Sequence, residues 1–328
     1  MRRVSTFCAL AVMAAQAQAP RNVRVDFKET TLKNGLRVIT VEDHSAPVVA
    51  ISITYNVGSR NERKGRTGFA HLFEHMMFKL SENVGSGEHF MLVFNNGGNM
   101  NGTTNEDRTN YFEVLPANQL DLALFLEADR MKSLEIKKAN LDNQINAVQE
   151  ERRLGLDNQP YGKSGELHQE MIYDNFAYKH SVIGSMEDLT AATVEDVSEF
   201  FKMYYAPNNA VLVLVGDFKT ADALAKIKAN FESIARQPDP PTVDMTEPQQ
   251  KAERKATVDD MLARAPQQPQ STKGAIVRQS AREQRSFESK TSACSGSESS
   301  EWTARGPARV AQGTDLQHTD GCLERWPF

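Results

Sequence analysis

The chain has 328 residues, of which 40% are hydrophobic and 25% are charged, and its formal net charge is −5 at pH 7. Such a mildly acidic composition gives no reason to expect nucleic-acid binding. The length is sufficient for two domains. After the N-terminus no apolar run reaches the roughly 18–20 residues that cross a bilayer, so we expect no membrane span in the mature chain.

In chain order, we predict strands at 25–32, 36–41 and 48–55, helices at 67–80 and 88–95, a strand pair at 99–104 and 109–115, helices at 118–134 and 138–153, a mixed segment at 161–180, a helix at 193–204, a strand at 210–215 and a helix at 221–234. The dipeptide Asn34-Gly35 marks the first turn. Thr193 is a plausible N-cap of its helix. This order of elements predicts an α+β fold in which helices cover one face of an antiparallel sheet.

The first 19 residues have the pattern of an export signal. Arg2 and Arg3 form a short positive segment, residues 7–15 form an apolar core, and Ala17-Gln18-Ala19 fits a small-x-small cleavage site. We therefore predict removal of residues 1–19 and a periplasmic or secreted location in a bacterium. A loose N-terminal segment with a chance alanine run is the alternative.

The remaining chain divides by composition into three parts. Residues 23–236 carry the predicted α+β domain, and the Pro-rich, polar segment 237–265 is predicted to be a linker. From 266 to 328, Gln, Ser, Arg and Gly dominate and no helical or strand period persists. This pattern predicts a disordered tail, or an aberrant one that comes from a frameshifted or truncated reading frame.

The most specific motif of the chain is His71-Leu72-Phe73-Glu74-His75. Positions i, i+3 and i+4 share one face of a helix, so His71, Glu74 and His75 point the same way. Two imidazoles one turn apart can both reach one Zn²⁺ at about 2.0–2.1 Å, and the glutamate is free to take a proton from a bound water. H-x-x-E-H is the inverted zincin signature, which indicates a zinc metallopeptidase. A chance match on an ordinary helix is the alternative.

A catalytic zinc also needs a third protein ligand from another element. The predicted helix 138–153 ends with Glu150, Glu151, Arg152 and Arg153. Charged helix ends are usually solvated surface. The residues by themselves make both glutamates candidates and do not choose between them.

Six short motifs then follow one another in a recognisable order. They are Leu32-Lys33-Asn34-Gly35-Leu36, Gly68 to Met76, Gly97 to Thr104, Glu150-Glu151-Arg152-Arg153, Tyr204 to Ala210, and Val215-Gly216-Asp217-Phe218. From about residue 27 to 218 the chain resembles the pitrilysin-type zinc metallopeptidases, which include insulin-degrading enzyme and the mitochondrial processing peptidases. Within that family it looks like the N-terminal domain of a bacterial processing-peptidase-like subunit.

The resemblance implies the roles of individual residues. The family's third zinc ligand lies at a fixed distance after the second histidine, which here selects Glu151, although a single gap would exchange it for Glu150. The segment 99–104 is similar to the family's substrate-binding edge strand, so Asn99, Asn101, Gly102 and Thr103 are expected to bind peptide. An edge strand binds an added peptide through main-chain hydrogen bonds. A plain hairpin is the alternative for this segment.

The expected function is therefore zinc-dependent endopeptidase activity on peptides or unfolded segments, with Zn²⁺ as cofactor and Glu74 as general base on a zinc-bound water. Complete family members carry a second related half, and no second α+β pattern is visible after residue 265. A second peptidase-like half or sister subunit is therefore expected as a partner. A non-catalytic, peptide-binding subunit of a heteromeric peptidase is the main alternative, and a metal-storage protein is another.

Overall fold

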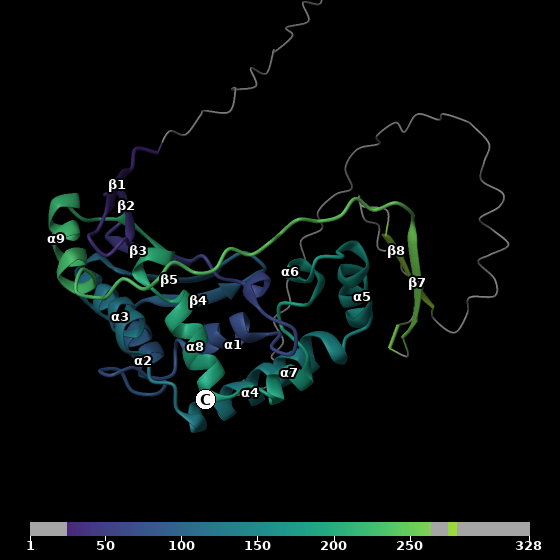
Figure 1. Cartoon of the computed structure of the whole chain (residues 1–328). Helices are drawn as coiled ribbons and strands as arrows, with labels where there is room; N and C mark the ends of the chain where they lie inside the picture. The colour runs from purple at the N-terminus through teal and green to yellow at the C-terminus, as the bar shows by residue number, and fades with distance from the viewer. Residues whose placement is uncertain (1–24, 261, 264–274, 281–328) are drawn as a thin grey trace, which may run out of the picture.

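The computed structural model describes residues 25–260, 262–263 and 275–280 (Figure 1). The predicted export signal at residues 1–19 lies outside this part of the chain. Six strands form one sheet in the order β1-β2-β6-β3-β5-β4. They are β1 (Lys28–Thr31), β2 (Arg37–Glu42), β3 (Val48–Tyr55), β4 (Asn99–Thr104), β5 (Thr109–Pro116) and β6 (Ala210–Gly216).

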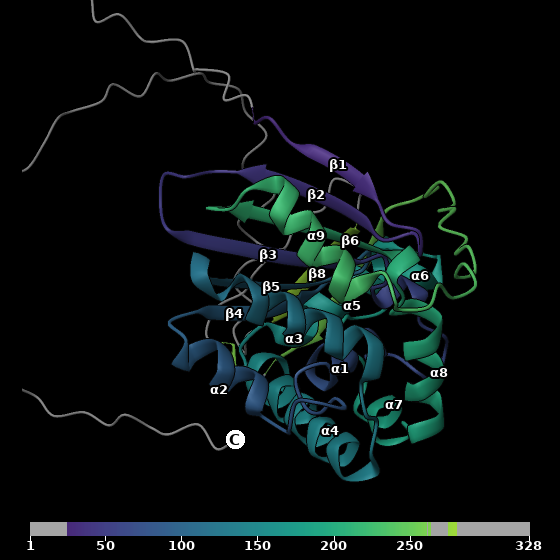
Figure 2. The same ribbon diagram turned by 90° about the vertical axis from the view of Figure 1, so that its left-hand side faces the viewer.

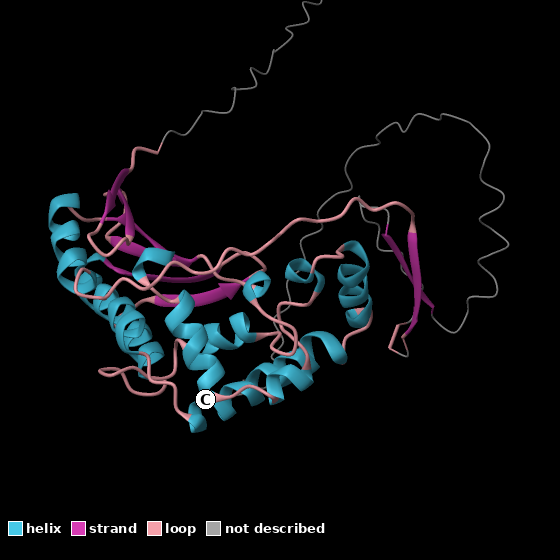
Figure 3. Cartoon of the chain, viewed as in Figure 1, coloured by secondary structure: helices cyan, strands magenta, loops and turns pink. Residues whose placement is uncertain are grey.

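The helices gather on one side of the sheet (Figure 3), as the predicted α+β fold requires. Thr193 caps α8 as expected, because its hydroxyl oxygen accepts a hydrogen bond from Asp196 N at 3.1 Å. The segment that the sequence left mixed contains α5 and α6. The helices are α1 (Phe69–Met76), α2 (Glu88–Asn95), α3 (Leu120–Ser133), α4 (Lys138–Arg152), α5 (Gly162–Ile172), α6 (Phe176–Lys179), α7 (Met186–Thr190), α8 (Val194–Tyr204) and α9 (Thr220–Phe231).

One strand pairing departs from the predicted antiparallel sheet. β6 lies between β2 and β3, where it pairs antiparallel with β3 and parallel with β2. β2 and β3 run in opposite directions, so any strand inserted between them must be parallel to one of the two. The other pairings are antiparallel.

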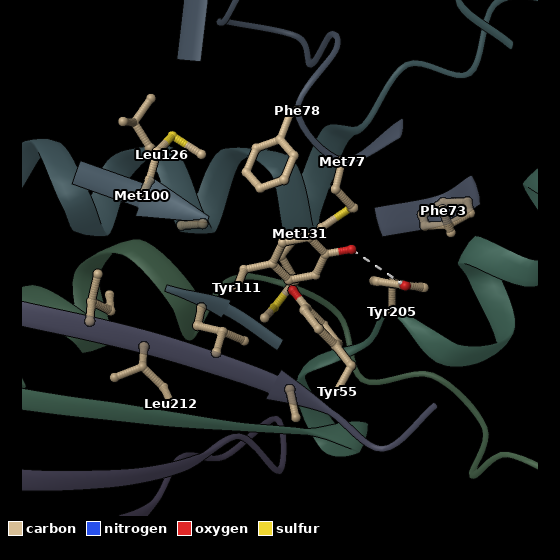
Figure 4. Packing of buried hydrophobic residues seen from close by; sticks show 14 of the residues in the cluster. Tyr55, Phe73, Met77, Phe78, Met100, Tyr111, Leu126, Met131, Tyr205 and Leu212 are labelled. Carbon is tan, nitrogen blue, oxygen red and sulfur yellow. Dashed lines mark hydrogen bonds between the residues drawn. The ribbon is translucent and has the colours of Figure 1, made fainter. Parts of the chain in front are cut away.

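The helix-covered face of the sheet forms the core. Side chains alternate between the two faces of a strand, and along β3 the buried positions are Val49, Ile51, Ile53 and Tyr55. Figure 2 shows α3 and α9 lying across this face. In the centre of the core, Tyr111 donates a hydrogen bond to Tyr205 (Figure 4).

Charged side chains are buried inside this core, next to the end of α1. Arg130 is 1% exposed and Glu127 is fully buried, and the two form an ion pair. The Arg130 guanidinium also lies 5.1 Å from the ring centroid of Phe78 and 4.4 Å from that of Tyr111. A buried charge is tolerated when it is paired, and removal of one partner leaves the other uncompensated.

Substitution Arg130→Met is therefore expected to lower the free energy of unfolding by about 3–5 kcal/mol, because Glu127 loses its buried partner. Lys226→Met is the matched control, since Lys226 pairs with Asp121 at the surface, where their side chains are 41% and 69% exposed. It should cost no more than about 1 kcal/mol. Urea denaturation measures both, and equal losses would contradict the buried-pair account.

Beyond α9 the structure differs in two places from the unstructured segments that the sequence predicted. Residues Arg254–Asp259 form β7 within the predicted linker, and Ala275–Ser280 form β8 within the predicted tail. The two strands pair with each other in parallel, so each supplies the backbone partners that the other lacks. The limits at 236 and 265 stay predictions, and residues 281–328 lie outside the described chain. No helix in the described part is long and apolar enough to cross a membrane.

Candidate metal centre

The motif helix α1 and the end of α4 bring three potential ligands together. Oε2 of Glu151 lies 3.6 Å from Nε2 of His71 and 3.4 Å from Nε2 of His75. A tetrahedral ion with ligands at about 2.0–2.1 Å spaces them roughly 3.3–3.4 Å apart. The two imidazoles and the carboxylate are therefore placed to share one Zn²⁺, and a nitrogen and oxygen donor set of this kind suits that ion.

The protonation states at the site also favour a cation. Burial and, to a lesser degree, the neighbouring His75 lower the pKa of His71 to about 4. A neutral imidazole is the form that binds metal. The hydrogen bond with His75 holds the pKa of Glu151 below its usual value. His71 thus presents a neutral nitrogen and Glu151 an ionised oxygen at neutral pH.

The sequence did not choose between Glu150 and Glu151 as third ligand, and the structure places their side chains in different surroundings. Glu151 faces the histidine pair, and these three side chains form a potential metal-binding group in the described chain. Glu150 instead pairs with Arg153, with its Oε2 3.0 Å from Nη1. The structure thus brings Glu151, and not Glu150, to the site.

Glu74 lies beside the histidines and is held by β4. Burial raises the pKa of its carboxyl above the usual value. The Thr104 hydroxyl donates a hydrogen bond to Glu74 Oε2 at 2.5 Å. A Cβ on Gly102 would lie 3.0 Å from Glu74 Oε1. The carboxylate therefore fills the space that a side chain at position 102 would occupy.

Of the four β4 residues predicted to bind peptide, Gly102 and Asn101 lie next to the site. Asn101 lines an open cavity of about 990 Å³ together with Glu74 and His75. Asn99 and Thr103 are exposed on β4, which is an end strand of the sheet. The role of the Thr104 hydroxyl was not anticipated, although the residue closes the Gly97 to Thr104 motif.

Comparison with known proteins identifies the family. The profile of the insulinase family (peptidase family M16) matches residues 37–182, and that of the M16 inactive domain matches residues 191–286. The second match passes residue 265 and enters the predicted tail.

Among individual relatives, the zinc protease PqqE of Helicobacter pylori is 36% identical over 251 residues, which cover 76% of this chain and 55% of the relative. The β subunit of the mitochondrial processing peptidase of Bos taurus is 25% identical over 222 residues, which cover 67% of this chain and 45% of the relative. The chain thus spans about half the length of the curated relatives it matches.

Solved structures agree with the sequence matches. The crystal structure of a protease from Helicobacter pylori superposes with a TM-score of 0.71 at 35% identity and covers 73% of this chain and 58% of that chain. The first half of the periplasmic protease PqqL from Escherichia coli has the same fold, with a TM-score of 0.66 at 22% identity, and covers 74% and 54% of the two chains. The chain belongs to the insulinase (M16) family of peptidases, whose matched relatives include proteins named as zinc proteases.

Proposed function

We propose that this chain is the metal-bearing part of a zinc-dependent endopeptidase in which His71, His75 and Glu151 hold the ion. The observation that carries the proposal is the placement of the three donor atoms within 4.8 Å of one another. The acidic group Glu74 lies beside them and next to an open cavity.

When bound by His71, His75 and Glu151, a Zn²⁺ ion would act as a Lewis acid that lowers the pKa of a water to about 7 and polarises a carbonyl group. Glu74 takes the proton of the attacking water on its carboxylate and passes it to the leaving amine. A raised pKa suits this exchange, because a general base works best when its pKa approaches the working pH. Thr104 fixes one oxygen of the carboxylate by its hydrogen bond, which leaves Oε1 to handle the proton.

The substrate we propose is an extended peptide that adds to β4. As an end strand, β4 has one edge without a strand partner among the described residues, and main-chain pairing along such an edge binds peptides of varied sequence. Asn99, Asn101, Gly102 and Thr103 would contact it there. Gly102 would place the peptide backbone close to Glu74.

The proposal also includes a partner and an export step. Because the chain matches only about half the length of its curated relatives, we expect a second peptidase-like half or sister subunit to complete the substrate chamber. The signal-like residues 1–19 support export to the periplasm or the exterior.

Glu151→Gln tests the third ligand. It should weaken zinc affinity by more than about 100-fold, beyond the 10–100-fold typical of residues that only support a ligand. Glu150→Gln is the matched control and should leave affinity unchanged, because its carboxylate pairs with Arg153. Competition with a zinc chelator measures both. Equal losses, or a loss in Glu150→Gln alone, would overturn the assignment.

Glu74→Gln tests the general base. The variant should retain stoichiometric zinc but lose peptide cleavage by about 10²–10⁴-fold, because the amide cannot accept the proton of water. Cleavage is assayed with the second half of Helicobacter pylori PqqE added as a separate polypeptide.

Cleavage that survives in Glu74→Gln would remove Glu74 from the mechanism. If the unaltered chain binds zinc but cleaves nothing with the second half present, the non-catalytic, peptide-binding subunit is the better description.

A further inference from the structure

One short segment of the chain contacts α4 and the residues just before α1, and these two helices carry the proposed ligands. It comprises residues 180–190, lies between α6 and α8 and includes α7; we call it the bracket. On the α1 side the bracket contacts Glu62 and Thr67. On the α4 side it contacts Arg152. α1 carries the two histidines and α4 carries the glutamate, so the contacts of the bracket influence the distance between these two helices.

Glu62 joins the bracket to the N-terminus of α1. Its buried carboxylate accepts hydrogen bonds from Gly68 N at 2.9 Å and Ala70 N at 2.8 Å. The first N–H groups of a helix lack partners within it, and negative charge there is stabilising. His180 Nε2 lies 2.9 Å from the same carboxylate, and its Nδ1 lies 2.8 Å from the Phe176 carbonyl oxygen. The Phe176 carbonyl oxygen can only accept, so Nδ1 donates to it, and Nε2 faces the Glu62 carboxylate.

The backbone of the bracket also packs directly on the residues that precede α1. Asp188 Oδ2 accepts hydrogen bonds from Thr67 N at 2.9 Å and from Thr67 Oγ1 at 2.6 Å. Gly68 and Gly184 both have positive φ, at 85° and 77°. A Cβ on Gly184 would lie 2.4 Å from Thr67 O and 2.5 Å from Gly68 Cα. The backbones at Gly184 and at Thr67–Gly68 are so close that no side chain fits between them.

On its other side the bracket is tied to α4 at both flanks of Glu151. Arg152 Nη1 donates to Gly184 O at 2.8 Å. Its guanidinium is itself fixed by the carboxylate of Glu166 at 2.6 and 2.9 Å. Gln149 Nε2 donates to Thr190 Oγ1 at 2.8 Å. The turn of α4 that carries Glu151 is thus fastened to the segment that holds the start of α1.

We infer that the bracket sets the spacing between the histidine pair and Glu151, so that Glu62 and Arg152 act as positioning residues for the metal although neither touches it. This inference rests on the proposed zinc site. The contacts of the bracket would explain why α1 and α4, which are remote in sequence, lie at this distance from each other. Residues that orient metal ligands typically contribute 10–100-fold to affinity.

The test measures zinc affinity of the full chain by chelator competition, without any activity assay. Glu62→Gln and Arg152→Gln should each weaken binding about 10- to 100-fold. Their Co²⁺-loaded forms should show altered visible absorption, because that spectrum reports ligand geometry. If Glu62→Gln does not fold, Asp188→Asn takes its place, since it weakens the neighbouring contact with Thr67.

A matched control separates positioning from general loss of stability. Asn34 is buried and donates to Phe231 O at 2.7 Å and Ile234 O at 3.0 Å, which ties the β1–β2 turn to α9. Asn34→Ala should lower the melting temperature yet leave zinc affinity within about twofold, since additivity holds for independent sites. A zinc loss in this control as large as in Glu62→Gln would assign the effect to stability and overturn the inference.

The double variant Glu62→Gln/Arg152→Gln gives the sharpest result. If both residues act through one bracket, the second substitution adds little to the first, and the combined loss is smaller than the product of the single losses. The inference would be contradicted if the two losses of zinc affinity multiply, or if the single variants bind zinc like the unaltered chain. Absence of zinc from the unaltered chain would instead overturn the proposed function, and the inference with it.

Discussion

The distance between α1 and α4 is the constraint on which the site depends. The two histidines are one helical turn apart, so the backbone of α1 fixes their spacing. The third donor comes from a different helix much later in the chain, and its position depends on how the two helices pack. The observed separations of 3.4 and 3.6 Å from Glu151 to the imidazoles require that packing to be held within a fraction of an ångström.

The fold holds α1 at both ends with buried polar groups rather than with apolar contacts alone. Glu62 satisfies the N–H groups at its start, and Arg130 lies against Phe78 just beyond its end. Buried polar groups are costly when unpaired but rigid when satisfied. Between these two anchors, the edge strand β4 approaches closely enough for Thr104 to bond Glu74. The same helix is thereby positioned against α4, which carries Glu151, and against the edge where we propose that peptide binds.

Much of the fold and of the candidate site could be predicted from the sequence. The other features depend on tertiary contacts, which local sequence patterns do not record. Helical spacing was enough for the histidine pair. The helical phase of α4 also contained an unused signal: its apolar residues Leu141, Ile145 and Val148 share one buried face, and position 151 lies closer to that face than position 150. Insertion of β6 between β2 and β3 leaves no trace in local periodicity, because tertiary topology decides it. The bonds of Glu62 and Thr104 likewise join residues from separate elements, which spacing along one element cannot reveal.

The central claim is that two imidazoles and one carboxylate of this chain bind zinc. X-ray absorption at the zinc K edge of the zinc-loaded chain tests it most directly, because it reports the type and distance of the atoms around the ion. The account predicts four-coordinate zinc with two histidine nitrogens at about 2.0–2.1 Å and carboxylate oxygen at about 2.0–2.2 Å. A sulfur shell at about 2.3 Å, or fewer than two imidazoles around the ion, would contradict it.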